Sequence, residues 1–301
     1  MARTLISFTP AAILSRLDLI GEYSLSSMLA EVPTVDSSSL LKQLSLHLPR
    51  LETRQIYDKE SVLREAERLA KRLQSLRAPF LNRIPCITQT SISLSDLHFC
   101  TVQDDIARSI LDSFHYILSY REHSNHFGLR LKSSSEWPMV MVSLSQFDLK
   151  NVESALTKKN GQVASALVLS RVFAFPVAPR NCFSFLMAKV REWVAENHPE
   201  IEVLVTYVNP NVGFSGASYK ADNWSLIGEE HGTRYLYLDD DYKTERFFYA
   251  HFHQPANLLL SSHGSRVSAS KHELKPLKIF IRRVSDFEAN KRNFHFERWS
   301  L

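Results

Sequence analysis

Cysteine is scarce in this sequence: the 301 residues contain only Cys86, Cys100 and Cys182. Three is an odd number, and the spacing does not match that of a zinc site. Free thiols are typical of the reducing cytoplasm, where disulfides are rare. The cysteine content therefore argues against a disulfide-stabilised secreted protein, and we expect a cytoplasmic location.

Long apolar runs are also absent. A membrane-spanning helix needs about 18 or more consecutive apolar residues, and no such run occurs here. The first residues lack the apolar core and the cleavage site of a signal peptide. With 44% hydrophobic and 23% charged residues, the composition is that of a globular protein that buries a core. We expect no membrane partner, and the oligomeric state stays open.

Positive charge is in small excess and is unevenly distributed along the chain. The net charge is +4, and from His263 to the C-terminus nine Lys and Arg residues stand against four Asp and Glu residues. A basic segment of this kind is either a solvated surface or a site for the phosphate groups of nucleic acid. Composition alone leaves both interpretations open.

The first 80 residues are predicted to be helical. Between Ser61 and Leu76, leucines recur at helical spacing with charged residues between them. Residues 78–85 contain two prolines and are interpreted as a linker. The sequence thus suggests three parts: a helical accessory region (1–80), a main domain (86–245) and a basic, aromatic C-terminal extension (246–301).

The main domain alternates strand-like and helix-like segments. Strands are expected at residues 86–102, 126–131, 139–144, 163–175, 201–208, 224–229 and 234–238. Helices are expected at residues 103–119 and 182–197 and, in shorter form, near 213–223. This order predicts an α/β fold in which a mixed central sheet is flanked by helices.

The strand, turn and helix at residues 163–197 resemble the phosphate-binding unit of the GNAT acyltransferase fold. The N-terminus of a helix offers free N–H groups and the positive end of a dipole, which suit a pyrophosphate. The same elements also describe an ordinary capped helix after a strand. The turn at 176–181 lacks the glycines usual in GNAT proteins, so a close approach of backbone to phosphate is less favoured.

This resemblance implies acetyl-CoA, or a related acyl-CoA, as the cofactor. Asn181 is expected to act as the N-cap of the helix, and Arg180 to add a positive charge beside the phosphates. The cofactor-binding residues that it implies are Val172, Phe173, Ala174, Phe175, Arg180, Asn181 and Cys182.

A second resemblance lies downstream. Residues 207–224 (YVNPNVGFSGASYKADNW) resemble the signature of the Mom group of phage DNA-modification proteins, GNAT-like enzymes that convert adenine in DNA to a carbamoylmethylated form. The resemblance extends over residues 98–240. It implies that Tyr219 is the general acid, or an orienting hydroxyl, for the departing thiolate. A core tyrosine with a satisfied hydroxyl is the structural alternative.

The same resemblance singles out four other residues. His115 and Tyr116 match a His-Tyr pair beside the substrate cleft of the Mom group, and an imidazole is a suitable base near neutral pH. Arg171 lies on an otherwise apolar strand face, so we expect it to meet a carboxylate, a carbonyl or a phosphate. Asn209 stands where the family usually has aspartate. An asparagine orients a substrate amide but does not act as a base.

Two histidine pairs are candidate metal ligands, His123 with His126 and His251 with His253. The second pair, on a strand, would place both rings on one face. Neither pair has an obvious third ligand, so no metal ligand is assigned. Iron is associated with the Mom group and is kept as an option.

Aromatic and basic residues interleave beyond residue 245, at residues 246–249, 282–283 and 291–299. Stacking on exposed or flipped bases uses this mixture, and we expect DNA as a partner. The leading hypothesis is therefore an acyl-CoA-dependent acyltransferase that modifies adenine in DNA. The alternatives are a GNAT N-acetyltransferase acting on a small amine or a protein, and a non-catalytic binding protein with the same fold.

Overall fold

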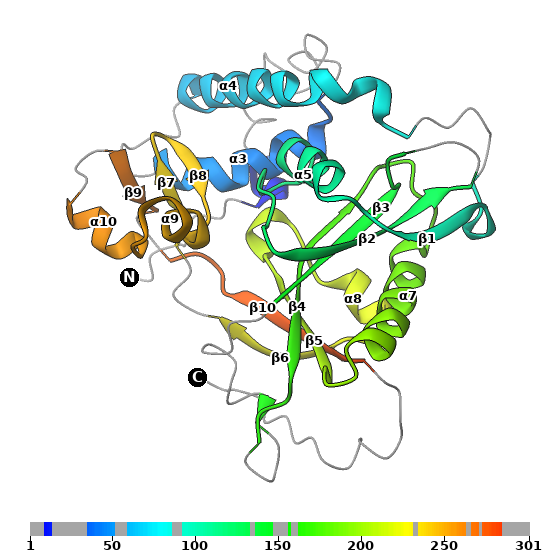
Figure 1. The fold of residues 1–301 in the computed structure, drawn as a ribbon. Coiled ribbons are helices and arrows are strands. Elements are labelled where there is room, and N and C mark those ends of the chain that lie inside the picture. The colour runs from blue at the N-terminus through cyan, green and yellow to red at the C-terminus, as the bar shows by residue number, and fades with distance from the viewer. Residues whose placement is uncertain are drawn as a thin grey trace. The chain divides into compact units, whose positions relative to one another are not determined.

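The computed structural model describes residues 9–13, 35–51, 59–85, 92–132, 136–146, 156–157, 162–230, 234–262, 266–270 and 273–284. The chain forms two compact units whose segments alternate along the sequence (Figure 1). The first unit contains Met1–Pro79, Asn209–Ser215 and His231–Pro276. The second contains Phe80–Val208, Gly216–Glu230 and Leu277–Leu301.

The second unit is built on a seven-stranded sheet with the order β1-β2-β3-β4-β5-β10-β6. Its strands are β1 Leu97–Thr101, β2 Ser124–Leu131, β3 Val140–Gln146, β4 Ala166–Ala174, β5 Val203–Val208, β6 Ser225–Glu230 and β10 Leu277–Arg283. Neighbouring strands are antiparallel except for β4 and β5, which are parallel. The expected α/β fold with a mixed central sheet is confirmed. The strand β10, which lies between β5 and β6, is not among the predicted strands.

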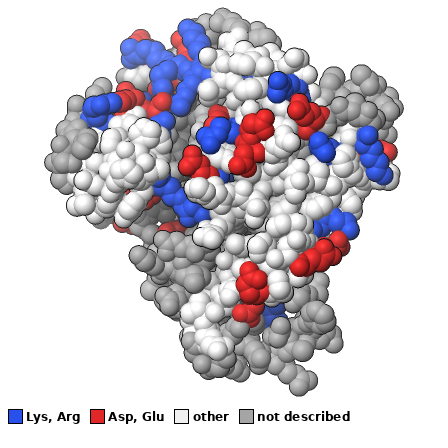
Figure 2. All heavy atoms as spheres, viewed as in Figure 1, with Lys and Arg blue, Asp and Glu red and all other residues white. Residues whose placement is uncertain are grey.

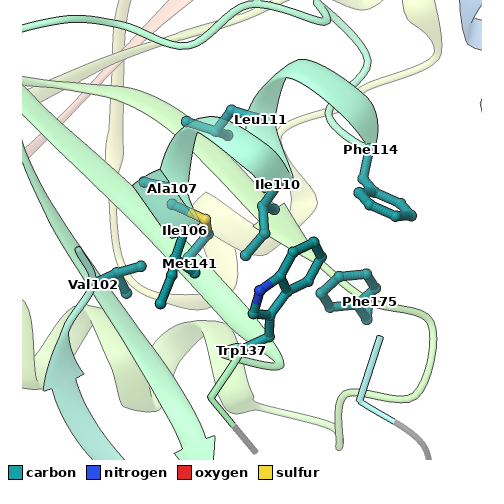
Figure 3. Close-up of a cluster of buried hydrophobic side chains, with 9 residues drawn as sticks. All are labelled: Val102, Ile106, Ala107, Ile110, Leu111, Phe114, Trp137, Met141 and Phe175. Atoms are coloured by element: carbon teal, nitrogen blue, oxygen red, sulfur yellow. The ribbon is translucent and has the colours of Figure 1, made fainter. Parts of the chain in front are cut away.

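Helices cover both faces of this sheet. The helix α5 (Asp104–Ser113) packs its apolar residues against Trp137, Met141 and Phe175 (Figure 3). The helix α7 (Cys182–Asn197) lies on the other face, where the rings of Phe127 and Trp193 are 4.6 Å apart. Successive side chains of a strand point to opposite faces, which is why β2 and β3 supply apolar residues to both layers.

Several predicted boundaries change. The helix expected at 103–119 ends at Ser113, with Phe114 as its C-cap. In the turn that follows, Leu118 has a φ of 50° and the Asp112 carboxylate accepts the N–H of Tyr120. These features reverse the chain directly after α5. The strand expected at 86–102 is observed only at Leu97–Thr101, while residues 86–91 lie outside the described part. The segment near 213–223 forms only the short helix α8, Ala217–Ala221.

The first unit combines helices with a small sheet of order β8-β7-β9. Its described elements include α3 Ser37–Leu51, α4 Lys59–Arg77, the 3₁₀ turn Pro210–Val212, β7 Leu236–Leu238, β8 Asp241–Lys243, α9 Glu245–Phe252, α10 Ala256–Ser262 and β9 Val267–Ala269. The expected N-terminal helical region is confirmed, and a 3₁₀ helix, Ala78–Arg83, follows it where a linker was expected. No helix in the described ranges has the length and apolar character to cross a membrane.

A partly buried polar network joins α3 and α4 to the small sheet. The Asp241 carboxylate on β8 accepts hydrogen bonds from Arg68, at 3.1 Å, and from Arg72. The Tyr237 hydroxyl donates to the Leu46 carbonyl at 2.8 Å. Contacts between residues so far apart in sequence explain why 231–276 shares a unit with the N-terminal helices.

His47 makes the stability of the first unit sensitive to acid. Its Nδ1 lies 2.9 Å from the Gln43 carbonyl, and its Nε2 accepts the N–H of Tyr242 at 3.2 Å. The neutral ring is therefore protonated on Nδ1. Burial lowers its pKa from 6.5 to about 4.

We expect acidification from pH 6.5 to pH 4 to lower the free energy of unfolding through His47. In that interval the unfolded chain binds a proton that the folded unit does not, so the stabilisation present above pH 6.5 is lost by pH 4. A shift of this size corresponds to about 3 kcal/mol. Urea denaturation followed by circular dichroism at several pH values measures it. The profile of His47→Gln should be flatter, and an identical profile would contradict the assignment.

Candidate active site

The parallel strands β4 and β5 separate soon after they meet. Their pairing covers only three positions and ends at Val168 opposite Val205, whereas β4 continues to Ala174. On its other side β4 stays paired with β3. Arg171 pairs with Ser143 and Leu169 pairs with Leu144, so Ser170 forms a bulge between them. The edge of β4 that faces β5 therefore carries backbone groups with no strand partner beyond Val168. We call this feature the β4–β5 split.

A threonine hydroxyl bridges the two strands where the split begins. Thr206 follows Val205 on β5, and its Oγ1 donates to the Leu169 carbonyl at 3.0 Å. The same oxygen is 3.4 Å from the Tyr219 hydroxyl. Thr206 is only 2% exposed, so these contacts are not shared with bulk water.

Tyr219 on α8 reaches the split through close aromatic packing. Its ring meets those of Phe183 and Trp224 edge-on, each at 5.3 Å, and stacks on Phe280 at 5.9 Å. Gly216 precedes α8 with a φ of +80°, and a Cβ there would lie 2.6 Å from the Phe280 ring. Only glycine permits this conformation and this approach. Burial raises the pKa of Tyr219 to about 12, so its hydroxyl is protonated at neutral pH.

Arg171 and Tyr116 lie near Tyr219. Arg171, next to the bulge, donates through Nε to the Ser119 carbonyl at 2.9 Å and through Nη1 to the Ser170 carbonyl at 2.8 Å. Backbone carbonyls are one of the partners expected for this arginine. Burial raises the pKa of Tyr116 to about 12, and Arg171 opposes that rise. Tyr116 in turn contributes to the raised pKa of Tyr219.

His115 is buried beside Tyr116. Its side chain is 3% exposed, and the two rings are 4.5 Å apart. The Nδ1 atom accepts the N–H of Ile117 at 3.2 Å, so a neutral ring carries its proton on Nε2. Such a ring donates at Nε2, and a role as base requires the other tautomer. The second unit thus brings together four of the five predicted catalytic residues, while their chemical roles stay predictions.

Asn209, the fifth, belongs to the first unit. Its Nδ2 donates to the Tyr235 hydroxyl at 2.9 Å, and its Oδ1 accepts both the backbone N–H and the side-chain N–H of Asn211, at 2.9 and 3.0 Å. Both ends of the amide are therefore engaged in closing the turn after β5. This geometry gives Asn209 a structural role, and the orienting role stays a prediction.

The predicted cofactor residues lie along the split and at the start of α7. Val172, Phe173 and Ala174 form the end of β4. The ring of Phe173 packs on that of Phe175 at 4.8 Å, and Phe175 is 4% exposed within the α5 cluster. These two rings therefore belong to the core. A ligand at the split would meet the backbone of this segment rather than its phenylalanine side chains.

The turn before α7 places Asn181 at the expected N-cap position, but its side chain does not cap the helix. Asn181 is the N-cap, and its carbonyl accepts the N–H of Phe185 at 3.0 Å. Its φ is 64°, and its side chain makes no capping hydrogen bond. In this left-handed conformation the backbone makes the turn, and the N–H of Cys182 donates to the Pro179 carbonyl at 3.3 Å. Arg180 is exposed and Cys182 is buried. The helix still presents the N–H groups of its first turn, which have no partner within a helix.

The histidine pairs do not form metal sites in the described part of the chain. His126 Nδ1 is 2.8 Å from the Ser143 hydroxyl, and Nε2 is 3.4 Å from that of Tyr120. His251 and His253 lie on α9 and at its C-cap rather than on a strand, so the expectation of one shared face is wrong, since positions i and i+2 of a helix diverge. No three His, Cys, Asp or Glu side chains gather among the described residues. These residues do not fit an iron centre.

A buried ion pair, which the sequence analysis did not single out, braces α7 against the end of α8. Arg191 Nη1 donates to Asp222 Oδ2 at 2.9 Å, and the same oxygen accepts the indole N–H of Trp224 at 2.9 Å. The Trp224 backbone N–H also donates to the Tyr219 carbonyl at 2.9 Å. Asp222 therefore holds the residues that pack around Tyr219.

The topology and the comparisons agree on the class of the protein. A mixed sheet whose parallel pair opens beside a helix N-terminus is the GNAT-like architecture expected from the sequence. The model of the Mom protein family matches residues 96–280, more than half of the chain. The chain belongs to the Mom protein family. The curated protein sequences give no match.

Solved structures with similarity to the chain include N-acetyltransferases. NAA60 from Arabidopsis thaliana in complex with acetyl-CoA is 12% identical, with 62% of this chain and 98% of that chain covered and a TM-score of 0.37. Spermidine N-acetyltransferase SpeG from Vibrio cholerae is 10% identical, with 65% and 99% covered and a TM-score of 0.39. No residue role follows from likeness at this level.

Proposed function

We propose that this protein is an acyl-CoA-dependent transferase that modifies adenine in DNA. Membership of the Mom protein family supports DNA as the substrate. The observation that carries the acyl-transfer part is the β4–β5 split with the protonated Tyr219 hydroxyl beside it. In this arrangement a thioester lying along β4 has a proton donor at its reacting end.

The unpaired edge of β4 is suited to the amide groups of a coenzyme A arm. Backbone N–H and C=O groups along Val172–Ala174 pair with β3 on one side only, and an extended ligand with amides satisfies the other side in the manner of an added strand. The first turn of α7 follows that edge after a short turn, and its N–H groups and dipole favour a pyrophosphate. Exposed Arg180 adds positive charge in the same turn.

The acyl-transfer step needs a proton at the departing sulfur. As the acceptor amine forms its bond to the carbonyl carbon, the C–S bond breaks and the thiolate takes the Tyr219 proton. The proton lost by the amine restores the tyrosine, so the step is balanced. A phenol whose pKa is about 12 remains protonated until the thiolate forms, which is the state that a general acid requires.

Mass spectrometry of nucleosides tests the substrate. DNA from cells that express the protein should contain a modified adenine nucleoside, and DNA from cells that express Tyr219→Phe at the same level should lack it. Unmodified DNA with full expression of the native protein would overturn DNA as substrate. If acetyl-CoA still raised the melting temperature in that case, a small amine or a protein would become the acceptor to test.

The helix α9 offers a surface suited to a nucleic acid. Tyr249 is 55% exposed, and Arg246 lies three residues before it on the same side of the helix. Lys243 Nζ sits 4.9 Å from the centre of the Phe247 ring. An exposed aromatic ring beside cations supports base stacking and phosphate contact together. Lys and Arg also gather over α4 (Figure 2), but α4 has no aromatic residue on which a base could stack. We therefore place DNA contact on α9.

We expect Tyr249→Ala to weaken binding of single-stranded DNA about 5- to 100-fold, because one stacking platform is lost. Arg246→Gln should reduce the slope of log affinity against log salt by about one. Fluorescence anisotropy over a salt series measures both. Arg64→Gln, which removes an exposed arginine of α4, is the matched control. A larger loss for Arg64→Gln than for Arg246→Gln would move the surface to α4.

A further inference from the structure

The Thr206 hydroxyl faces two acceptors with a single hydrogen. The Leu169 carbonyl is 3.0 Å away and the Tyr219 hydroxyl oxygen 3.4 Å away. A hydroxyl donates to one acceptor at a time, and the shorter contact is to Leu169. In the resting protein the Thr206 hydroxyl therefore donates to the Leu169 carbonyl. This hydrogen bond links β4 and β5 just beyond Val168, where their backbone pairing ends.

Tyr219 has no other hydrogen-bonding partner for its hydroxyl among the described residues. Its ring neighbours Phe183 and Phe280 are apolar. The third ring neighbour, Trp224, has its indole N–H engaged by Asp222. When Tyr219 gives up its proton, the phenolate is left in a buried site, where an unpaired charge is costly. Of the described groups, Thr206 is the one within hydrogen-bonding distance of the Tyr219 hydroxyl, at 3.4 Å, and it has a hydrogen to offer.

We propose that Thr206 is a positioning residue for the reaction, and that its hydroxyl hydrogen turns from the Leu169 carbonyl to the Tyr219 oxygen as Tyr219 protonates the leaving thiolate. This inference rests on the proposed acyl transfer. The O–H bond of Tyr219 breaks and an S–H bond forms on the leaving group. Thr206 keeps its own proton and changes only its acceptor. The proton released by the acceptor amine then restores Tyr219, and the Thr206 hydrogen returns to Leu169.

Two substitutions separate the hydroxyl from the shape of the side chain. Thr206→Val keeps the shape and removes the hydrogen, whereas Thr206→Ser keeps the hydrogen. We expect Thr206→Val to lower kcat about 10- to 100-fold, as loss of a hydrogen bond to a charged group does, with KM for acyl-CoA within about twofold. Thr206→Ser should stay within about threefold of the native kcat. Release of free thiol from acetyl-CoA in the presence of DNA provides the assay.

The Tyr219→Phe background identifies the residue through which Thr206 acts. With the tyrosine hydroxyl absent, Thr206→Val should cause no further loss of kcat, because coupled residues are not additive. An equal loss in both backgrounds, or a Thr206→Ser variant as slow as Thr206→Val, would overturn the proposal. Melting temperatures of all variants exclude unfolding as the cause.

A titration without turnover keeps this inference separate from the proposed function. In protein labelled with ¹³C at the tyrosine Cζ, the Tyr219 signal is identified by its loss in Tyr219→Phe. Its titration should begin at higher pH in Thr206→Val than in the native protein, and at the native pH in Thr206→Ser. If the variants titrate in this way but the native protein releases no thiol with DNA, DNA is disproved as the substrate, while the hydrogen bond from Thr206 to Tyr219 is retained. The same titration in Thr206→Val as in the native protein would overturn the inference about Thr206.

Discussion

Replacing Tyr219 by phenylalanine is expected to slow acyl transfer about 100- to 10,000-fold, the usual contribution of general acid catalysis. The substitution removes one oxygen and keeps the ring that packs among Phe183, Trp224 and Phe280. The fold and the affinity for acyl-CoA should therefore change little. Steady-state thiol release measures the loss, which should appear in kcat rather than in KM.

The pH profile adds a second signature of Tyr219. Burial raises its pKa to about 12 from the usual 10, so its acid form persists through the range in which an exposed tyrosine begins to ionise. The native rate should show no alkaline decline from this group below about pH 10. Arg266→Gln, which changes an exposed side chain, is the control for the substitution. A Tyr219→Phe variant that retains a third of the native kcat would remove this hydroxyl from the mechanism.

The sequence predicts the parts of this fold that local pattern determines. The apolar residues of α7 recur at helical spacing, and the run at Val203–Val208 has the composition of a buried strand, so both elements were predictable. The strand at Leu277–Arg283 was not, because its basic residues resembled a charged surface. Its place between β5 and β6 depends on pairing with segments about 50 or more residues away, which local periodicity does not report.

The candidate site, like the fold, could be predicted from the sequence only in part. Tyr219, Tyr116 and Arg171 were found through family resemblance, and the structure gathers them. Thr206 carries a signal in the sequence, since a hydroxyl inside an otherwise apolar strand needs a hydrogen-bond partner. The sequence does not show which partner, because Leu169 and Tyr219 approach only in the folded sheet. The position of the Asn181 cap was predictable but its geometry was not, for a related reason: the residue type favours a side-chain cap, but the backbone of this turn is left-handed.

The ion pair between Arg191 and Asp222 is expected to make a large contribution to the free energy of unfolding. Its side chains are 13% and 8% exposed, so neither is well solvated. Asp222→Ala leaves the guanidinium of Arg191 without its carboxylate and the indole N–H of Trp224 without its acceptor. Breaking one side of a buried pair costs about 3–5 kcal/mol. We expect a loss of that order in the free energy of unfolding, measured by urea denaturation.

The same substitution should lower activity beyond its effect on folding. Trp224 packs on the Tyr219 ring and donates its backbone N–H to the Tyr219 carbonyl, so release of the indole displaces the hydroxyl from Thr206. Asp222→Asn keeps an acceptor for the indole and should lose stability with a smaller fall in kcat. Arg266→Gln, which breaks an exposed pair with Asp239, should change neither quantity measurably. If Asp222→Ala matched Arg266→Gln in both measurements, Asp222 would not brace Tyr219.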